Sequence, residues 1–158
     1  PERAVIVAGI DESASAAIVA DRYLYVSGYA GWFRIYDVGD PPRPALVGQV
    51  NAGTTIVVLA VADGYAYVAD TDRSLAIVDV TDPTAPTVTA RWMQGVDDVA
   101  VADDLAFVVR RNELVVVDVS SPAIPSRMTS AYTRADAESS GVGHPRLSAK
   151  RVMRSMSF

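Results

Sequence analysis

The chain has 158 residues, half of them hydrophobic, and this length and composition suit a folded domain with a sizeable core rather than a disordered chain. The formal net charge of −5 argues against a nucleic-acid partner, because phosphate binding requires clustered lysine and arginine. Without cysteine there are no disulfides or thiolate metal sites, and no apolar run approaches the ~20 residues that span a bilayer.

The chain opens with residues 1–9, an apolar segment that aligns with residues 44–52 further along. Residues 44–52 close the first copy of a repeat. We therefore expect residues 1–9 to be the outer strand of a preceding or closing unit of the same kind.

A repeat of about 40 residues fills residues 10–130, in copies at about 10–50, 51–92 and 93–130. Each copy has an Asp-containing turn before an aromatic or apolar strand, then an apolar strand ending in Asp-Val, and then a Pro-x-x-Pro turn. Asp37, Asp79 and Asp118 mark the same position in the three copies. Such regular self-similarity indicates a repeat architecture.

The second copy shows most clearly what one unit folds into. Turn signals separate four short segments rich in β-branched residues: Ile56 to Val61, Tyr65 to Ala69, Leu75 to Val80 and Thr87 to Arg91. Asp63-Gly64 favours a tight hairpin, and Pro83 stops the third strand because proline lacks an amide donor. Four antiparallel strands per ~40 residues make one propeller blade.

The pattern therefore predicts an all-β, β-propeller-like fold of about three four-stranded antiparallel blades plus one N-terminal strand. Because propellers typically have four to eight blades, we expect the ring to be incomplete. Its unpaired blade faces would then favour self-association.

The best copy also resembles a known family. Ala66-Tyr67-Val68-Ala69-Asp70, Leu75-Ala76-Ile77-Val78-Asp79-Val80 and Asp82-Pro83-Thr84-Ala85-Pro86 resemble the LVIVD repeat, which is found in bacterial and archaeal surface or secreted proteins. The resemblance implies a β-propeller and an extracellular or cell-envelope location. It implies no established catalytic residues.

The residues that recur in every copy are interpreted as structural. An Asp between a buried strand and a Pro-containing turn is suited to accept hydrogen bonds from turn amides. These structural repeat positions are Asp37, Asp79, Asp118, Pro41, Pro83 and Pro122.

Loop residues that differ between the copies are the candidates for partner contacts. Tyr29 and Trp32 are large aromatic residues near a turn of the first copy, suited to stack on a sugar or anchor a protein. Arg73, Arg110 and Arg111 occupy corresponding turns of the next two copies and would favour an acidic ligand. The alternative is structural: the aromatic residues would pack between blades, and the arginines would lie in solvated turns.

The repeat ends abruptly, and residues 131–158 are expected to form an irregular or disordered basic tail with five basic and two acidic residues. His144 lies in this tail without a catalytic partner. No glycine pattern typical of phosphate binding and no metal-ligand spacing occurs, so no cofactor and no metal site is predicted.

The sequence thus favours a non-enzymatic repeat scaffold, a segment of a surface or envelope propeller that binds a protein or glycan. One alternative is a fragment of a propeller enzyme whose active site lies in the central channel. Another is a truncated fragment without independent activity. Fold alone does not separate these alternatives, because propellers host both binding and catalysis.

Overall fold

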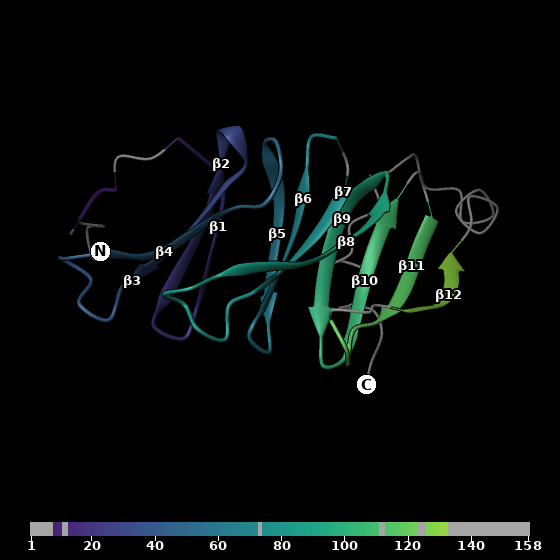
Figure 1. The fold of residues 1–158 in the computed structure, drawn as a ribbon. Coiled ribbons are helices and arrows are strands. Elements are labelled where there is room, and N and C mark those ends of the chain that lie inside the picture. Colours follow the sequence, from purple (N-terminus) through teal and green to yellow (C-terminus); the bar gives the residue numbers. More distant parts are fainter. Residues whose placement is uncertain (1–7, 11–12, 73, 111–112, 123–125, 133–158) are drawn as a thin grey trace, which may run out of the picture.

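A computed structural model describes residues 8–10, 13–72, 74–110, 113–122 and 126–132 of the chain. The described part consists of three four-stranded antiparallel sheets, each built from four strands that follow one another along the chain. The predicted all-β, propeller-like fold is confirmed, and the three sheets do not close into a ring (Figure 1). No helix in these residues is long and apolar enough to cross a membrane.

Each sheet is one blade. Blade 1 consists of β1 (Ala14–Ala20), β2 (Tyr23–Gly28), β3 (Trp32–Asp37) and β4 (Ala45–Asn51). Blade 2 consists of β5 (Ile56–Ala62), β6 (Tyr65–Asp70), β7 (Ser74–Asp79) and β8 (Thr87–Gln94). Blade 3 consists of β9 (Val96–Ala102), β10 (Leu105–Arg110), β11 (Glu113–Asp118) and β12 (Ser126–Tyr132).

The hairpin between the first two strands of each blade begins with an Asp in the same backbone conformation. Asp21, Asp63 and Asp103 have φ of 53°, 51° and 50°, in the left-handed region that Asp tolerates better than most residues. In blade 2 the following Gly64 also has a positive φ, of 77°. Two successive positive φ values match the twist of the strands that a two-residue hairpin joins.

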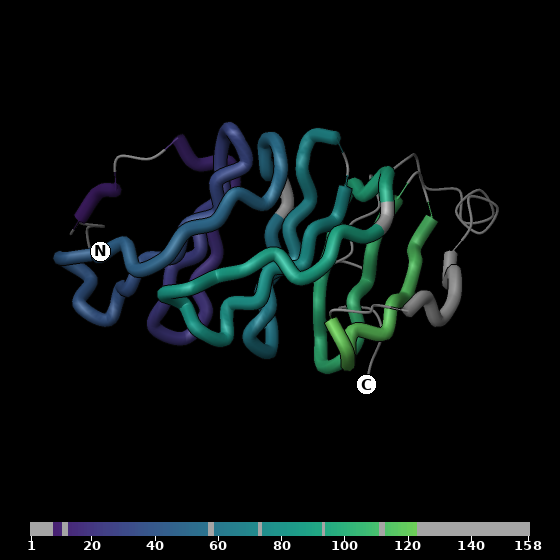
Figure 2. The backbone as a smooth tube through the Cα atoms, viewed as in Figure 1, coloured from purple at the N-terminus to yellow at the C-terminus, as the bar shows by residue number. Residues whose placement is uncertain are grey.

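The blades stand in a row, with β1, β5 and β9 as neighbouring inner strands (Figure 1). Figure 2 follows the chain from β4, the outer strand of blade 1, into β5, the inner strand of blade 2. This path, repeated from β8 to β9, places consecutive blades face to face. Strand alternation then buries apolar side chains from both faces of blade 2.

Two core clusters fill the spaces between the blades. Between blades 1 and 2, Phe33 and Ile35 are fully buried together with Val78 of blade 2. Between blades 2 and 3, Ile77 is fully buried with Val115 of blade 3. Burial of a side chain of this size contributes roughly 1.5–3 kcal/mol, so the clusters hold each blade to its neighbour.

The Pro-x-x-Pro turn of blade 2 packs on β4, the outer strand of blade 1. Pro86 of blade 2 is buried, and a Cβ built on Gly48 of β4 would lie 2.1 Å from the carbonyl oxygen of Pro83. A glycine at this point therefore allows the turn to reach β4.

Two expectations concern residues outside the described part. Residues 1–7 of the expected N-terminal strand and residues 133–158 of the expected tail are not described. Strand β12 extends to Tyr132, two residues into the segment assigned to that tail.

Candidate partner-binding surfaces

A short 3-10 turn, η1 (Tyr29–Gly31), joins β2 to β3 and exposes Tyr29, whose exposed fraction is 64%. Gly31 has φ of 74°, and its carbonyl oxygen accepts a hydrogen bond of 2.8 Å from the amide of Ala52. The Asn51 side chain donates a second bond of 2.8 Å to the Ala30 carbonyl. The turn is thus fixed to the connection between blades 1 and 2, and Tyr29 projects from a supported backbone.

Trp32 lies directly after η1, at the start of β3, and has 37% of its surface exposed. The Arg34 guanidinium lies 5.6 Å from the centre of a Trp32 ring, within the range of a cation–π contact. Arg34 also donates to the Gln49 side chain at 3.3 Å. Trp32 and Arg34 alternate with buried Phe33, so both lie on the face of blade 1 that looks away from blade 2.

The connection that supports η1 is held on its other side by Asp70, a buried carboxylate with 5% exposure. Asp70 accepts hydrogen bonds from the amides of Thr54, at 3.4 Å, and Ser74, at 3.1 Å. The amide of Thr71 donates to the Thr55 carbonyl at 2.8 Å. The Asp70 carboxylate therefore has a structural role, because it holds two backbone amides at this end of blade 2.

The structure does not bring Arg110, the predicted arginine that lies among the described residues, to the two aromatic residues. Arg110 ends β10 in blade 3, and blade 2 stands between it and Tyr29 (Figure 1). Arg110 is half-buried, and its Nε is enclosed with no hydrogen-bond partner among the described residues. Arg73 and Arg111 lie outside the described residues. A continuous surface of aromatic and arginine side chains is thus not formed by the described part of the chain.

The opposite end of the sheets carries the recurring Asp and Pro residues. The carboxylates accept hydrogen bonds from amides two residues further on: Asp37 from Gly39 at 2.8 Å, Asp79 from Thr81 at 2.9 Å and Asp118 from Ser120 at 2.9 Å. Each arrangement is an Asx turn that ends a strand. The turns lead into Pro41, Pro83 and Pro122.

Blade 1 replaces one of these turn interactions. Thr81 and Ser120 also donate their hydroxyls to the same carboxylates, at 2.6 and 2.7 Å. Gly39 has no hydroxyl, and Arg22 forms an ion pair with Asp37 instead. The Arg22 hydrogen bond, followed by the Gly39 amide bond, lowers the pKa of Asp37 below its usual value.

A cleft of about 360 Å³ opens at this end between blades 1 and 2. Its lining combines phenol rings, carboxylates and apolar residues, among them Asp21, Tyr23, Tyr25, Asp63 and Val61. Burial, and then the Asp21 charge, raises the pKa of Tyr25. The sequence reasoning missed this cleft, although tyrosines at matching places in the first two copies offered a signal.

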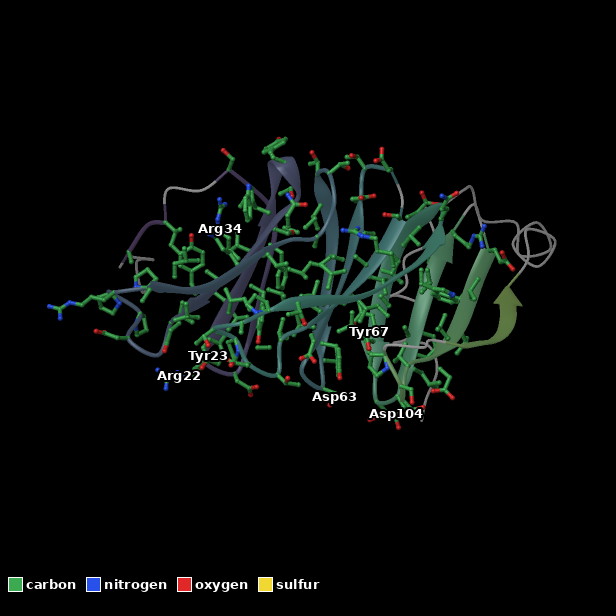
Figure 3. The ribbon with its side chains drawn as sticks, viewed as in Figure 1. Arg22, Tyr23, Arg34, Asp63, Tyr67 and Asp104 are labelled. Carbon is green, nitrogen blue, oxygen red and sulfur yellow. The ribbon has the colours of Figure 1, made fainter. Side chains whose placement is uncertain are left out.

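Tyr67 occupies the position of Tyr25 in blade 2 and is 2% exposed. In Figure 3 it lies near the end of the sheets that carries Asp63 and Asp104. Burial, with smaller contributions from Asp63, Tyr65 and Asp104, raises the pKa of Tyr67 to about 12. The phenol therefore stays neutral at physiological pH.

A propeller enzyme would need its active site along the channel that the inner strands line. The charged side chains of β1, β5 and β9 are Asp97 and Asp98, neighbours on one strand. Among the described residues, no three His, Cys, Asp or Glu side chains gather closely enough to hold a metal ion. These strands thus offer two carboxylates and no assembled catalytic group.

Three consecutive four-stranded blades stacked face to face define a β-propeller-like repeat protein. The sequence model of the LVIVD repeat matches residues 13–52, 57–94 and 95–133, one match for each blade. The chain belongs to the LVIVD repeat family, and the resemblance seen in its sequence is confirmed.

Solved structures show the same fold at low sequence identity. The RRP9 WD40 repeats have a TM-score of 0.64 and 10% identity, and the match covers 81% of this chain and 41% of that one. The Cps50 (Swd1) β-propeller domain of Myceliophteria thermophila has a TM-score of 0.61 and 12% identity, covering 75% of this chain and 40% of that one.

The computationally designed Ika4 protein has a TM-score of 0.63 and 8% identity, covering 80% of this chain and 76% of that one. The chain spans 35%, 41% and 42% of the first three solved chains it resembles. No curated protein sequence matches the chain. At these identities the solved structures establish the fold alone.

Proposed function

We propose that the chain is a non-enzymatic scaffold that binds a protein or glycan partner through the exposed aromatic residues Tyr29 and Trp32. The observation that carries the proposal is the 64% exposure of Tyr29 on a turn held by two hydrogen bonds, from the Ala52 amide and the Asn51 side chain. An aromatic side chain on a supported backbone loses little conformational entropy on binding, which suits it as an anchor.

Tyr29 and Trp32 offer two kinds of contact. Both rings can stack on a sugar or enter a pocket of a protein partner, and the Tyr29 hydroxyl can also form hydrogen bonds. Arg34 lies close to the Trp32 ring and adds positive charge and hydrogen-bond donors beside the two aromatic side chains. The proposed location, extracellular or in the cell envelope, rests on the family resemblance.

Binding to arrayed polysaccharides and to a displayed library of peptides tests the proposal with the full chain. We expect Tyr29→Ala and Trp32→Ala each to weaken the selected interaction by about tenfold or more, equivalent to ~1.4 kcal/mol. Arg43→Ala, an exposed change in the Pro-containing turn at the other end of blade 1, is the control and should leave binding unchanged. Equal binding by all three variants, or hydrolysis of a bound probe, would contradict the proposal.

A further inference from the structure

We propose that the cleft between blades 1 and 2 binds a primary ammonium group carried on an aliphatic chain. The cleft opens at the end of the sheets that carries the recurring Asp residues, whereas Tyr29 is exposed at the other end. It is therefore a second site, separate from the partner-binding surface proposed above.

The cleft is small, and both blades line it. Its volume of about 360 Å³ is at the lower end of the ~300–1,000 Å³ typical of small-molecule sites. Blade 1 provides Tyr23 and Tyr25, and the first hairpin of blade 2 provides Asp63 and Gly64. Figure 3 shows Tyr23 and Asp63 at the same end of the two blades. Because Gly64 has no side chain, that hairpin contributes only backbone beside the Asp63 carboxylate.

The lining of the cleft is negatively charged. Asp21 and Asp63 begin the first hairpins of successive blades, and both line the cleft. Its described lining includes no lysine, arginine or histidine. Arg22 follows Asp21 in the chain but pairs with Asp37, to which its Nε donates a hydrogen bond of 3.2 Å. Two carboxylates without a basic side chain in the same lining attract a cation and repel an anion.

A buried phenol gives an independent indication of a ligand. Tyr25 lines the cleft although it is only 5% exposed, and its hydroxyl has no hydrogen-bond partner among the described residues. Its ring is stacked with Phe33, with ring centres 6.0 Å apart. Buried hydroxyl groups in proteins generally have a hydrogen-bond partner. An ammonium group, which has three N–H donors, would supply one from within the cleft.

The remaining lining selects among cations. Among the described residues no three His, Cys, Asp or Glu side chains gather closely enough to hold a metal ion. Val61, Val80 and Pro83 form an apolar part of the lining, which suits a hydrocarbon chain. Phenol rings also attract cations, as the Arg22 guanidinium shows at 5.9 Å from the centre of the Tyr23 ring. An ammonium group on an aliphatic chain fits both the charged and the apolar part.

An NMR titration of the full chain with pentylamine tests the proposal, with the tyrosine rings labelled with ¹³C. We expect the Tyr23 and Tyr25 resonances to shift with a dissociation constant of roughly 1 mM, while the Tyr29 resonances stay in place. Tetramethylammonium, glucose and calcium chloride are the comparison probes. None of them combines N–H donors with an aliphatic chain, so none should match the response to pentylamine.

Four variants identify the groups that bind the amine. Asp21→Asn and Asp63→Asn each remove one charge, and Asn tolerates the positive φ of these positions, 53° and 51°. Each should weaken pentylamine binding by about three- to fivefold. Tyr25→Phe retains the stacked ring and should weaken binding by about fivefold through loss of the hydroxyl. Asp103→Asn is the matched control, because Asp103 has the same place in blade 3, with φ of 50°, and does not line the cleft.

A short peptide with an acetylated N-terminus and one lysine separates the two sources of the ammonium group. Binding at least about tenfold tighter than that of pentylamine assigns it to a lysine side chain of a protein partner, and equal or weaker binding assigns it to a free amine.

Unmoved Tyr25 resonances would overturn the proposal. Equal pentylamine binding by the Asp21→Asn, Asp63→Asn and Asp103→Asn variants, or an equal response to any comparison probe, would do the same. Tyr29→Ala should leave pentylamine binding unchanged, so this experiment and the partner-binding experiment can fail independently.

Discussion

Gly48→Ala tests how closely consecutive blades approach each other. A Cβ at this position would lie 2.1 Å from the Pro83 carbonyl oxygen and 2.9 Å from Pro86 Cδ. Ordinary carbon–oxygen contacts begin near ~3.3 Å, so the Pro83 carbonyl would have to move by about 1.2 Å. Since that oxygen belongs to the backbone, no side-chain rotation relieves the clash.

The turn that contains Pro83 cannot yield locally. Asp82 accepts hydrogen bonds from the amide and hydroxyl of Thr84, at 2.9 and 2.7 Å, and its carbonyl accepts one from Ala85 at 3.0 Å. The turn would therefore move as a unit and loosen the contact between blades 1 and 2. Overpacking of this kind costs about 1–3 kcal/mol, and we expect ~2 kcal/mol.

Urea unfolding followed by circular dichroism measures the effect as a lower midpoint at an unchanged slope. Gly9→Ala is the matched control, because a Cβ there meets nothing within 4 Å. Replacing glycine by alanine also stabilises the folded protein by ~0.4–1 kcal/mol, because it lowers the conformational entropy of the unfolded chain. The control variant corrects for that effect. If Gly48→Ala is as stable as Gly9→Ala, the blades do not approach as closely as the structure shows.

Two pH predictions follow from perturbed side chains. Hydrogen bonds from the side chains and then the amides of Thr84 and Ser120 lower the pKa values of Asp82 and Asp118 below 3.8. The two carboxylates therefore stabilise the folded state above the pKa of the unfolded chain, and this stabilisation is lost as the pH falls through their pKa values in the folded state. Replacing both residues by Asn should flatten the acid side of the curve of stability against pH, measured by thermal unfolding. Burial raises the pKa of Tyr67 to about 12. The neutral Tyr67 phenol therefore contributes its full stabilisation of the folded state below pH ~10, the pKa of an unfolded tyrosine, and this stabilisation is lost as the pH rises toward the pKa in the folded state. In a phenolate absorbance titration, Tyr67→Phe should remove one late-ionising tyrosine from the high-pH end of the curve. A titration unchanged by that variant would contradict the assignment.

The recurring pattern allowed the fold to be predicted because its signals are local. Asp63-Gly64 sets a two-residue hairpin, and Asp79 followed by Thr81 and Pro83 ends a strand whatever lies across the sheet. Repetition of these signals at a regular spacing indicates blades, since one four-stranded sheet cannot bury both faces alone. An all-β chain of three stacked blades follows from the sequence itself.

Contacts between blades could not be predicted from the sequence, because they depend on the tertiary structure. Strand pairing, bulges and the stacking of sheets bring Gly48 against Pro83. They also place blade 2 between Arg110 and Tyr29. Residues with equivalent positions in the repeat lie in different surroundings according to whether another blade covers them, as Val19 and Val61 show. The sequence determines each blade through neighbouring residues, whereas packing between distant segments decides which of its side chains face a partner.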